Sequence, residues 1–373
     1  ITGLTSFIYY FDDVKGSVLA PGESIVIGFT FAPDAEAAFQ GVLEIQHSGQ
    51  NNPVTVDLSG TGTDIAPVGF GKSILGGVAA PDSPTSLHWG PDGRLYVAFQ
   101  DGTINIYSVV RNGSNDYSST LDESITLVKD IPNHDDDGTP NPNVNDRLVT
   151  GIMIAGTAQS PIIYATSGDP RIGAGPDGED LNLDTNSGTL SRLTWDGSQW
   201  SKVDLVRGLP RSEENHNVNG LVLDESTNTI YLTSSGNTNN GAPSFNFAYL
   251  AEYAYSTAIR SVDMNVIDAL PDLVDVNGTV YKYNLPTLDD EDRDFDGNGS
   301  DEDLANGYQD VFGGNDGKNQ AYIDPNSPVQ MYSPGYRNPY DIVLTQNGTL
   351  YTIDNGANAG WGDVPIIDPE TGL

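Results

Sequence analysis

The sequence predicts an all-β chain, and three observations lead to this prediction. The 373 residues include 42 glycines and 23 prolines, as expected for a protein with many tight turns. Short runs alternate between apolar and polar residues, which is the period of half-buried strands. From about residue 65 onward, one strand–turn–strand pattern recurs four times. The fold class predicted is therefore all-β, with repeated hairpins as its main unit.

Residues 1–63 form a separate β pattern. Residues 24–31 alternate, and residues 42–45 and 54–58 predict two further strands. One segment resembles the immunoglobulin-like modules of the hydin and abnormal-spindle type. It reads LAPGESIVIGFTFAPDAEAAFQGVLEIQHSGQNNPVTVDLSGTGT. That resemblance implies an immunoglobulin-like β-sandwich. Such a sandwich has about seven strands, so this one is expected to be partial. Residues 60–63, GTGT, are expected to form a linker.

The repeated hairpin predicts a β-propeller over residues 65–373. Each copy has a short apolar strand, a polar turn and a second strand with a tyrosine at a fixed place. The copies are residues 85–99, 150–166, 219–233 and 340–353. Repeated hairpins of this kind are typical of propeller blades, each a sheet of about four strands. An ordinary β-sandwich is the alternative.

Other segments complete the predicted elements. Additional strands are expected at residues 102–109, 188–196 and 278–283. Two helices are possible in an insertion, at residues 249–259 and 263–270. Long polar or acidic loops are expected at residues 133–146 and at about 288–318.

The charge of the chain limits its partners. Asp and Glu number 52 against 16 Lys and Arg, giving a formal net charge of −36. Nucleic acids and anionic membrane surfaces would need a basic patch, so both are excluded as partners. No cysteine is present, so disulfides and thiolate metal sites are excluded as well. No apolar run is long enough to span a bilayer.

An acidic loop predicts a Ca²⁺ site. Residues 292–303 read DRDFDGNGSDED, with carboxylates at the first, third, fifth and twelfth positions and glycine at the sixth. This is the spacing of an EF-hand-like loop, in which alternate side chains converge on one hard cation. The expected ligands are Asp292, Asp294, Asp296, Asn298 through its carbonyl, and Asp303. The alternative is a solvated acidic loop.

Two polar corners carry the other candidate residues. His216 lies in NHNVNG, directly before the third hairpin, where an imidazole is suited to general base work. A hydrogen-bonded loop histidine is the equal alternative. Arg337 lies in the turn GYRNP before the fourth hairpin, as a charged fork for carboxylates. Its alternative is a salt bridge to one of the many acids.

The segments that contain these corners resemble one family. GYRNPYDIVLTQNGTLYTIDNGANAGWGD, EENHNVNGLVLDESTNTIYLTSSGNTNNGAP and GGNDGKNQAYIDPNSPVQMYSPG are similar to the glucose/sorbosone dehydrogenases. The resemblance covers roughly residues 65–373. It implies a six-bladed-type propeller that oxidises sugars with pyrroloquinoline quinone (PQQ) and Ca²⁺. About four blades fit within the chain, so the propeller is expected to be incomplete at its C-terminal end.

The resemblance also implies roles for individual residues. His216 matches the catalytic base, which takes the proton from the sugar hydroxyl as hydride passes to the quinone. Arg337 and Asn338 match a pair that lies against PQQ. The carbonyls of Gly356 and Ala357 match a Gly-Pro pair that holds the PQQ-bound Ca²⁺. Tyr340 departs from the family, because a glutamine is frequent at its place in active members.

Two functions follow as hypotheses. The first is a secreted bacterial dehydrogenase that depends on PQQ and Ca²⁺ and acts on a sugar or alcohol. The second is a non-catalytic, Ca²⁺-stabilised propeller within a large adhesive, surface or filament-forming protein. The immunoglobulin-like module and the acidity favour the second. Sugars or polysaccharides, further domains of a longer chain, and self-assembly are the partners expected.

Overall fold

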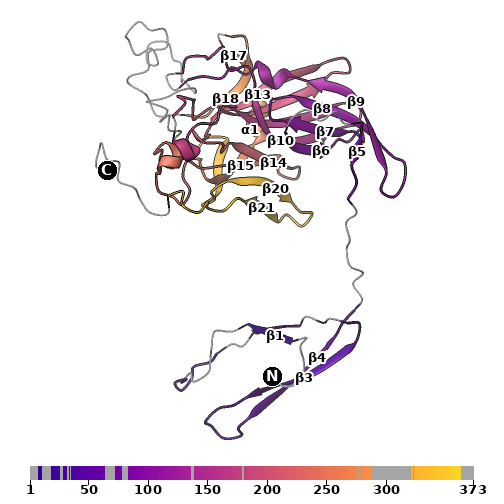
Figure 1. Ribbon diagram of the computed structural model, residues 1–373, viewed down its shortest axis with the longest axis vertical. Coiled ribbons are helices and arrows are strands. Elements are labelled where there is room, and N and C mark those ends of the chain that lie inside the picture. The colour runs from indigo at the N-terminus through magenta and orange to yellow at the C-terminus, as the bar shows by residue number, and fades with distance from the viewer. Residues whose placement is uncertain are drawn as a thin grey trace, which may run out of the picture. The chain divides into compact units, whose positions relative to one another are not determined.

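The computed structural model contains two compact units, Ile1–Lys72 and Ser73–Leu373. The structure describes residues 7–10, 18–25, 28–31, 33, 35–63, 72–77, 83–135, 138–178, 180–275, 277–286, 321 and 323–362. Strands dominate both units (Figure 1), and the described part contains one short α-helix. The prediction of an all-β chain is therefore confirmed.

The first unit holds two antiparallel strand pairs. Its strands are β1 (Phe7–Tyr10), β2 (Gly28–Phe31), β3 (Ala38–Ile45) and β4 (Val54–Thr61). Strand β1 pairs with β2, and β3 pairs with β4. Its small core consists of Leu43 and Leu58 with partly buried aromatic and aliphatic side chains around them. The immunoglobulin-like assignment stays a prediction.

The linker predicted at residues 60–63 is wrong in part, because β4 continues through Thr61. Gly60 pairs with Phe39 in the ladder. A Cβ atom at Gly60 would lie 2.7 Å from the ring of Phe31, so this glycine makes room for an aromatic side chain. Glycine here serves packing within a sheet, and not the flexibility of a connection.

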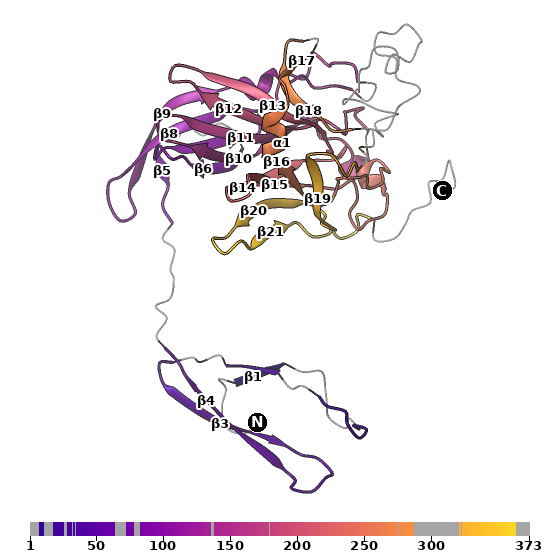
Figure 2. The same ribbon diagram turned by 180° about the vertical axis from the view of Figure 1, so that it is seen from behind.

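The second unit consists of four sheets, seen from opposite sides in Figures 1 and 2. Sheet 1 contains β5 (Leu75–Gly76), β9 (Tyr117–Ile125), β8 (Ile104–Arg111), β7 (Leu95–Phe99) and β6 (Pro84–Trp89) in that order. Sheet 2 contains β10 (Leu148–Gly156), β11 (Pro161–Gly168), β12 (Gly188–Trp195), β13 (Trp200–Leu209), β18 (Val280–Asn284) and β17 (Leu273–Val274). Sheet 3 contains β14 (Val218–Asp224), β15 (Thr229–Ser234), β16 (Ala258–Asp263) and β19 (Val329–Pro334). Sheet 4 contains β20 (Pro339–Leu344) and β21 (Leu350–Asp354).

Each predicted repeat is the first hairpin of one of these sheets. The four hairpins are β6–β7, β10–β11, β14–β15 and β20–β21, all antiparallel. We call β6, β10, β14 and β20 the inner strands. Each packs against the inner strand of the next sheet, from β6 to β10, from β10 to β14 and from β14 to β20. The fold of this unit is therefore propeller-like.

Helices are few and short. The structure has 3₁₀ turns η1 (Leu127–Asp130), η2 (Gly175–Asp177) and η3 (Phe245–Phe247) and the helix α1 (Met264–Ala269). The side chain of Asp263 caps α1 by accepting from the backbone N–H groups of Asn265 and Val266. The helix expected at 263–270 is confirmed. The one expected at 249–259 is wrong, because this segment is irregular and leads into β16. No helix in the described residues is long and apolar enough to cross a membrane.

A hydrogen-bond relay joins the inner strands. Thr85 Oγ1 on β6 donates to the carbonyl of Val149 on β10 at 2.6 Å. Thr150 on β10 donates in the same way to the carbonyl of Val218 on β14. Asn219 and Tyr340 continue the relay, as the next paragraph describes. Every donor is the first residue of a repeated hairpin, so the repeat in sequence is a repeat of contacts.

The last two links close the relay. Asn219 Nδ2 on β14 donates to the carbonyl of Pro339 on β20 at 3.1 Å. Tyr340 Oη on β20 then donates to the carbonyl of Thr85 on β6 at 3.1 Å. Tyrosine is the longest of the four donors. Tyr340 therefore links the fourth sheet to the first. It is the residue at which the sequence departs from the glucose/sorbosone dehydrogenases that it resembles.

Two apolar cores lie between the sheets. Between sheets 1 and 2 the core is built from Tyr96, Ile104, Ile106, Ile152, Ile163 and Leu193, among others. Between sheets 2 and 3 it is built from Leu190, Leu205, Leu221, Ile230 and Leu232, among others. All of these side chains are buried. Sheets stacked face to face with interdigitating apolar side chains provide the main stabilisation of such a fold.

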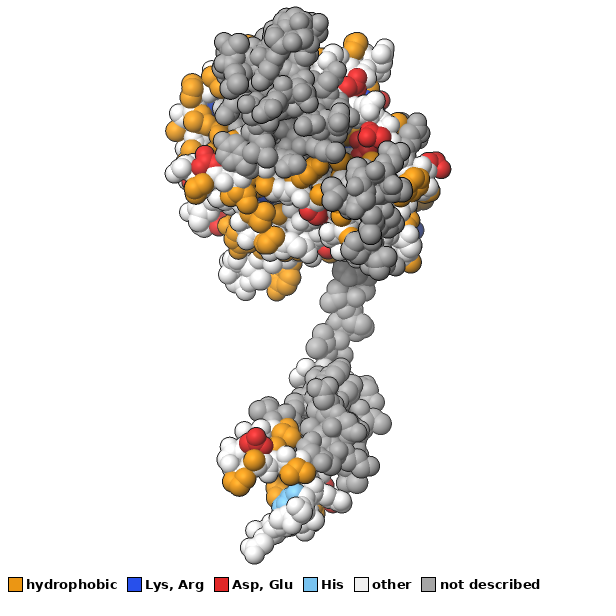
Figure 3. All heavy atoms as spheres, turned by 90° about the vertical axis from the view of Figure 1, so that its left-hand side faces the viewer, with side chains coloured by type: hydrophobic (Ala, Val, Ile, Leu, Met, Phe, Trp, Pro, Cys, Tyr) orange, Lys and Arg blue, Asp and Glu red, His pale blue; other side chains and the backbone are white. Residues whose placement is uncertain are grey.

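Sheet 4 has fewer strands than its neighbours. It has two strands in the described part of the chain, whereas the other three sheets have four to six. Ile342 is buried against the rest of the unit, but Val343, Tyr351 and Ile353 are exposed. Figure 3 shows orange hydrophobic side chains on the surface among acidic ones, with few basic side chains. Within the described residues β21 pairs with β20 alone, and its exposed side chains include Tyr351 and Ile353.

The approach of β14 to β20 predicts the effect of a substitution at Gly220. A Cβ atom there would lie 2.5 Å from Asp341 Oδ1 and 2.8 Å from Asp341 Cα. We expect Gly220→Ala to lower the free energy of unfolding by about 1–3 kcal/mol, because the backbone of β20 must shift. Urea unfolding followed by tryptophan fluorescence measures this, since all four tryptophans lie in the second unit.

Gly356→Ala is the matched control. A Cβ atom at Gly356 would meet no heavy atom within 4 Å, so this variant should unfold like the wild type. Equal stability of the two variants would show that β14 and β20 are not in close contact.

Candidate functional site

The residues predicted to form a site meet at one end of sheets 3 and 4. His216 precedes β14, and Arg337 and Asn338 precede β20. The loop after β15 joins these corners, because the N–H of Gly236 donates to the carbonyl of Arg337 at 2.9 Å. The sequence separates His216 from Arg337 by a complete sheet, and the fold brings them to the same polar corner.

His216 is buried, with 2 % of its surface exposed. Its Nδ1 lies 2.8 Å from the carbonyl oxygen of Gly236. A carbonyl only accepts, so Nδ1 carries the proton and Nε2 keeps its lone pair. Within the described residues, Nε2 makes no hydrogen bond, and its charged neighbour is Glu214, whose Oε2 lies 3.8 Å away.

The surroundings of His216 keep its imidazole neutral. Burial lowers its pKa to about 4, the bond to Gly236 opposes this, and the positive charges of Arg337 and Arg211 add to it. Burial also raises the pKa of Glu214 above its ordinary value. A proton accepted at Nε2 would thus appear beside a carboxyl group that can stabilise the imidazolium.

Phe247 covers His216. The two ring centroids are 5.1 Å apart, and Phe247 is fully buried. The guanidinium carbon of Arg337 lies 5.8 Å from the centroid of the same phenyl ring, within cation–π range. Trp361 contacts Phe247 edge-on, at 6.1 Å between centroids. His216 and Arg337 therefore lie against one aromatic side chain.

Arg337 is held by amides. Its Nε donates to Asn239 Oδ1 at 2.9 Å, and the same oxygen accepts from the N–H of Asn358 at 2.8 Å. Asn239 in turn donates from Nδ2 to the carbonyl of Asn358 at 2.9 Å. Arg337 forms no ion pair with a carboxylate in the part of the chain that the structure describes. The alternative of a salt bridge is therefore not observed there, and the charge remains available to an anion.

Asn338 forms hydrogen bonds with several segments of the corner. Its Oδ1 accepts from Asn219 Nδ2 at 3.0 Å and from Ser235 Oγ at 2.6 Å. Its N–H donates to Asp354 Oδ1 at 2.7 Å. The side-chain oxygen that would meet a ligand thus already has two donors, so Asn338 holds β14, β15 and β20 together.

Gly356 and Ala357 follow β21 on the surface, and both are exposed. The N–H of Asn355 donates to the carbonyl of Asn338 at 3.1 Å, which anchors this segment beside Arg337. Backbone carbonyls are suitable ligands for Ca²⁺. No group of three or more His, Asp or Glu side chains within the described ranges could hold a metal ion. The predicted ligands Asp292, Asp294, Asp296, Asn298 and Asp303 lie outside the described residues.

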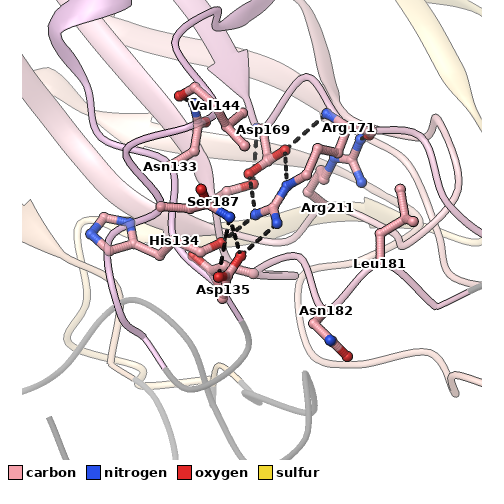
Figure 4. Close-up of polar contacts among 12 residues, drawn as sticks. Asn133, His134, Asp135, Val144, Asp169, Arg171, Leu181, Asn182, Ser187 and Arg211 are labelled. Atoms are coloured by element: carbon pink, nitrogen blue, oxygen red, sulfur yellow. Dashed lines mark hydrogen bonds and ion pairs between the residues drawn. The ribbon is translucent and has the colours of Figure 1, made fainter.

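A buried ionic network supports the His216 loop from sheet 2. Arg171 pairs with Asp169 at 2.8 Å and with Asp135 at 2.5 Å (Figure 4). Arg211 donates to the carbonyl of Arg171 and, through its N–H, to that of Thr185. Burial alone would raise the pKa of Asp169, but its contacts with Arg171 outweigh burial and hold this pKa below its ordinary value. The network fixes the chain on the side of His216 that faces sheet 2.

The sequence pattern did not indicate three residues of this corner. Phe247, Asn239 and Glu214 position or cover the predicted residues, yet none lies in a periodic segment. The run NTNNG at 237–241 is the available signal for Asn239, because consecutive amides favour buried turns. His134, in the loop after η1, is also buried, at 4 % exposure.

Comparison with known proteins adds likenesses at the level of structure. No protein-family model and no curated protein matches the sequence. One similar structure is the PQQ domain of a pyranose dehydrogenase from Coprinopsis cinerea, with 14 % identity, TM-score 0.35, and coverage of 76 % of this chain and 46 % of that one. A Thermus thermophilus protein described as a putative oxidoreductase (glucose dehydrogenase) has 14 % identity, TM-score 0.36, and coverage of 80 % of this chain and 70 % of that one.

A carbohydrate-active enzyme of family AA12 from Trichoderma reesei, in a calcium structure, has 15 % identity and a TM-score of 0.33. The match covers 55 % of this chain and 41 % of that enzyme, so the chain spans less than half of its length. All three TM-scores are below 0.5, and the fold assignment therefore rests on the four sheets of this chain itself.

The residues of the corner fit PQQ and Ca²⁺ in chemistry, but His216 is little exposed. PQQ is a flat polycarboxylate, which suits a guanidinium without a carboxylate partner and a neutral imidazole acceptor. The exposed backbone at Gly356 and Ala357 suits a hard cation. With Phe247 against its ring, however, His216 has 2 % of its surface exposed, which leaves little room for a ligand.

Glu213 provides a pH-dependent prediction. It is buried, and burial raises its pKa to about 7, against the bond that it accepts from the N–H of Leu181. Between pH 4.5 and about 7 the folded chain binds this proton and the unfolded chain does not, so this group makes stability fall as pH rises. We expect Glu213→Gln to raise the free energy of unfolding at pH 8 by up to about 3 kcal/mol.

The gain should shrink below pH 7 and vanish near pH 4.5, where both states carry the proton. Urea unfolding across this pH range measures it. Glu225→Gln, in an exposed turn, is the control and should show no such gain. A pH-independent difference for Glu213→Gln would contradict the assignment.

Proposed function

We propose that this chain is an oxidoreductase-type propeller that binds PQQ with Ca²⁺ and oxidises a sugar or an alcohol. The observation that carries the proposal is the meeting of His216, Arg337 and the segment after β21 at one corner, from separate parts of the sequence. These are the residues that the resemblance to the glucose/sorbosone dehydrogenases implies. Secretion is part of the proposal.

Arg337 and His216 would act on the two reaction partners. Arg337 would hold a carboxylate of the cofactor, with Asn239 keeping the guanidinium in place. The carbonyls of Gly356 and Ala357 would hold Ca²⁺. When bound, PQQ would supply the acceptor for hydride. His216 would accept the hydroxyl proton at Nε2, with Nδ1–H fixed on Gly236 and Glu214 balancing the new charge.

Dye reduction by the full chain, loaded with PQQ and Ca²⁺, tests the reaction over a panel of aldoses and alcohols. We expect turnover by the wild type and a loss of about 10²–10⁴-fold in His216→Ala, because the proton acceptor is gone. His88→Ala, in strand β6, is the control and should keep full activity. No dye reduction with any substrate of the panel would refute the enzyme hypothesis.

Cofactor binding is a separate test. Quenching of tryptophan fluorescence by PQQ in the presence of Ca²⁺ gives a Kd, and Trp361 lies at the proposed site. We expect Arg337→Ala to weaken binding by about 10–100-fold, the equivalent of one charge-assisted hydrogen bond. An unchanged Kd in that variant would exclude Arg337 as the anchor.

The burial of His216 supports a second function. A catalytic base needs access, and this one has 2 % exposure under Phe247. The alternative proposal is a non-catalytic propeller module, stabilised by Ca²⁺ at residues 292–303, in a larger surface protein. It requires no open site.

Calcium removal tests this alternative. We expect a chelator to lower the Tm, and Asp294→Asn with Asp296→Asn to remove the chelator effect. The stabilisation should be about 2.7 kcal/mol when free Ca²⁺ is about one hundred times Kd. An identical Tm with and without Ca²⁺ would contradict the calcium loop.

A further inference from the structure

Phe247 contacts both residues on which the proposed function depends. Its ring contacts the imidazole of His216 at 5.1 Å and lies 5.8 Å from the guanidinium carbon of Arg337. It has no exposed surface, while Phe245 on the same 3₁₀ turn is 41 % exposed. One turn thus places one phenylalanine over the polar corner and another at the surface, against Gly178 and Tyr249.

The loop that carries Phe247 is irregular, and one carboxylate joins its two ends, while Asn246 Nδ2 donates to the carbonyl of Gly175 at 2.9 Å. Residues 235–257 contain no strand or helix besides η3. Glu252 accepts from the N–H of Asn237 at 3.0 Å, from Thr238 Oγ1 at 2.6 Å and from Ser256 Oγ at 2.7 Å. These bonds join the two ends of the loop. The turn η3, which carries Phe247, lies between the joined ends and makes no contact with Glu252 among them.

Strain is concentrated directly after Phe247. Ala248, Tyr249, Tyr255 and Thr257 have φ angles of +51°, +58°, +69° and +51°. Residues with side chains rarely adopt this region, and the β-branched Thr257 least of all. Such strain gathers in ligand clamps and switch regions, where the surrounding structure compensates for it. The loop is therefore held in a conformation that the chain does not favour locally.

We propose that Phe247 is a displaceable stopper, and that the ligand that replaces it is a flat, anionic ring. Such a ring can stack where the phenyl group lies, pair its negative charge with Arg337, and reach His216 Nε2. An uncharged ligand would gain no ion pair, and an aliphatic ligand could not stack in place of the phenyl ring, so neither would offset the loss of the Phe247 contacts. The inference rests on the proposed function, since it concerns the same corner.

Reaction of His216 with diethyl pyrocarbonate, followed by peptide mass spectrometry, tests the stopper. In the wild type His216 should react far more slowly than His88. In Phe247→Ala and in the more conservative Phe247→Leu it should react faster, by on the order of tenfold or more, because the closed state is lost. Phe245→Ala, on the same turn, should react like the wild type. An unchanged rate in folded Phe247→Leu would overturn the proposal.

Binding of 2,6-naphthalenedicarboxylate, a flat dianion without redox chemistry, tests the ligand class. We expect Phe247→Ala to bind it on the order of tenfold more tightly than the wild type, because nothing has to be displaced. Cyclohexanecarboxylate should show no such gain. Equal affinity of both variants for the flat dianion would overturn this part.

The same variants separate the stopper from the proposed function. If Phe247→Ala exposes His216 and binds the flat dianion but not PQQ, the stopper is supported and the PQQ proposal fails. If PQQ binds the wild type and Phe247→Ala equally well while His216 stays protected, the PQQ proposal stands and the stopper is refuted.

Discussion

The side chain that begins each repeated hairpin donates a hydrogen bond to the inner strand of the next sheet, and the propeller-like unit depends on this contact. Thr85, Thr150 and Asn219 each reach the residue before the next donor, and Tyr340 returns to Thr85. Glycine lets the backbones come close enough, since a Cβ at Gly151 would lie 2.4 Å from the carbonyl of Asn219. Apolar cores between the sheets supply most of the stabilisation, but apolar burial is non-directional and does not by itself fix the orientation of one sheet against the next. The relay is directional, so it fixes how far one sheet is rotated against the next.

The position of the candidate site follows from this arrangement. Because the inner strands run alike, the segments that precede β14 and β20 emerge at one end, and so do those that follow β15 and β21. Polar side chains from these four segments then bury one another, and this costs free energy unless each finds a partner. Asn338 and Asn239 satisfy neighbouring backbone and side-chain groups, whereas Oε2 of Glu214, beside His216, is buried without a hydrogen bond in the described structure. A buried polar group without a hydrogen bond lowers the free energy of unfolding, and such groups are common at functional sites.

Sequence reasoning succeeded where the signal is local. The four hairpins were predicted because alternation and a polar turn are visible within a few positions, and residues 263–270 were given as a possible helix. It failed where a contact joins distant segments. A strand at 278–283 was predicted, but not that β18 would lie parallel to β13. The meeting of His216 with Arg337 came from the family resemblance, and Phe247 was missed because it lies in an aperiodic loop. The resemblance to the glucose/sorbosone dehydrogenases concerns residues that touch ligands. It carries no information about Phe247, which packs against two of them.

The bond from Tyr340 to Thr85 also has a meaning for how the chain acquires its structure. It joins residues 255 positions apart, so it is among the least local contacts of the molecule. The entropy lost in closing a loop grows slowly with its length, and the sheets between these two residues shorten the effective loop once they have formed. During synthesis the first sheets leave the ribosome before the fourth. The four hydrogen bonds between the inner strands are therefore complete only when the fourth sheet is present. Topologies of high contact order fold slowly for this reason. The hydrogen bond of Tyr340 to Thr85 can therefore form only after both the first and the fourth sheets are present.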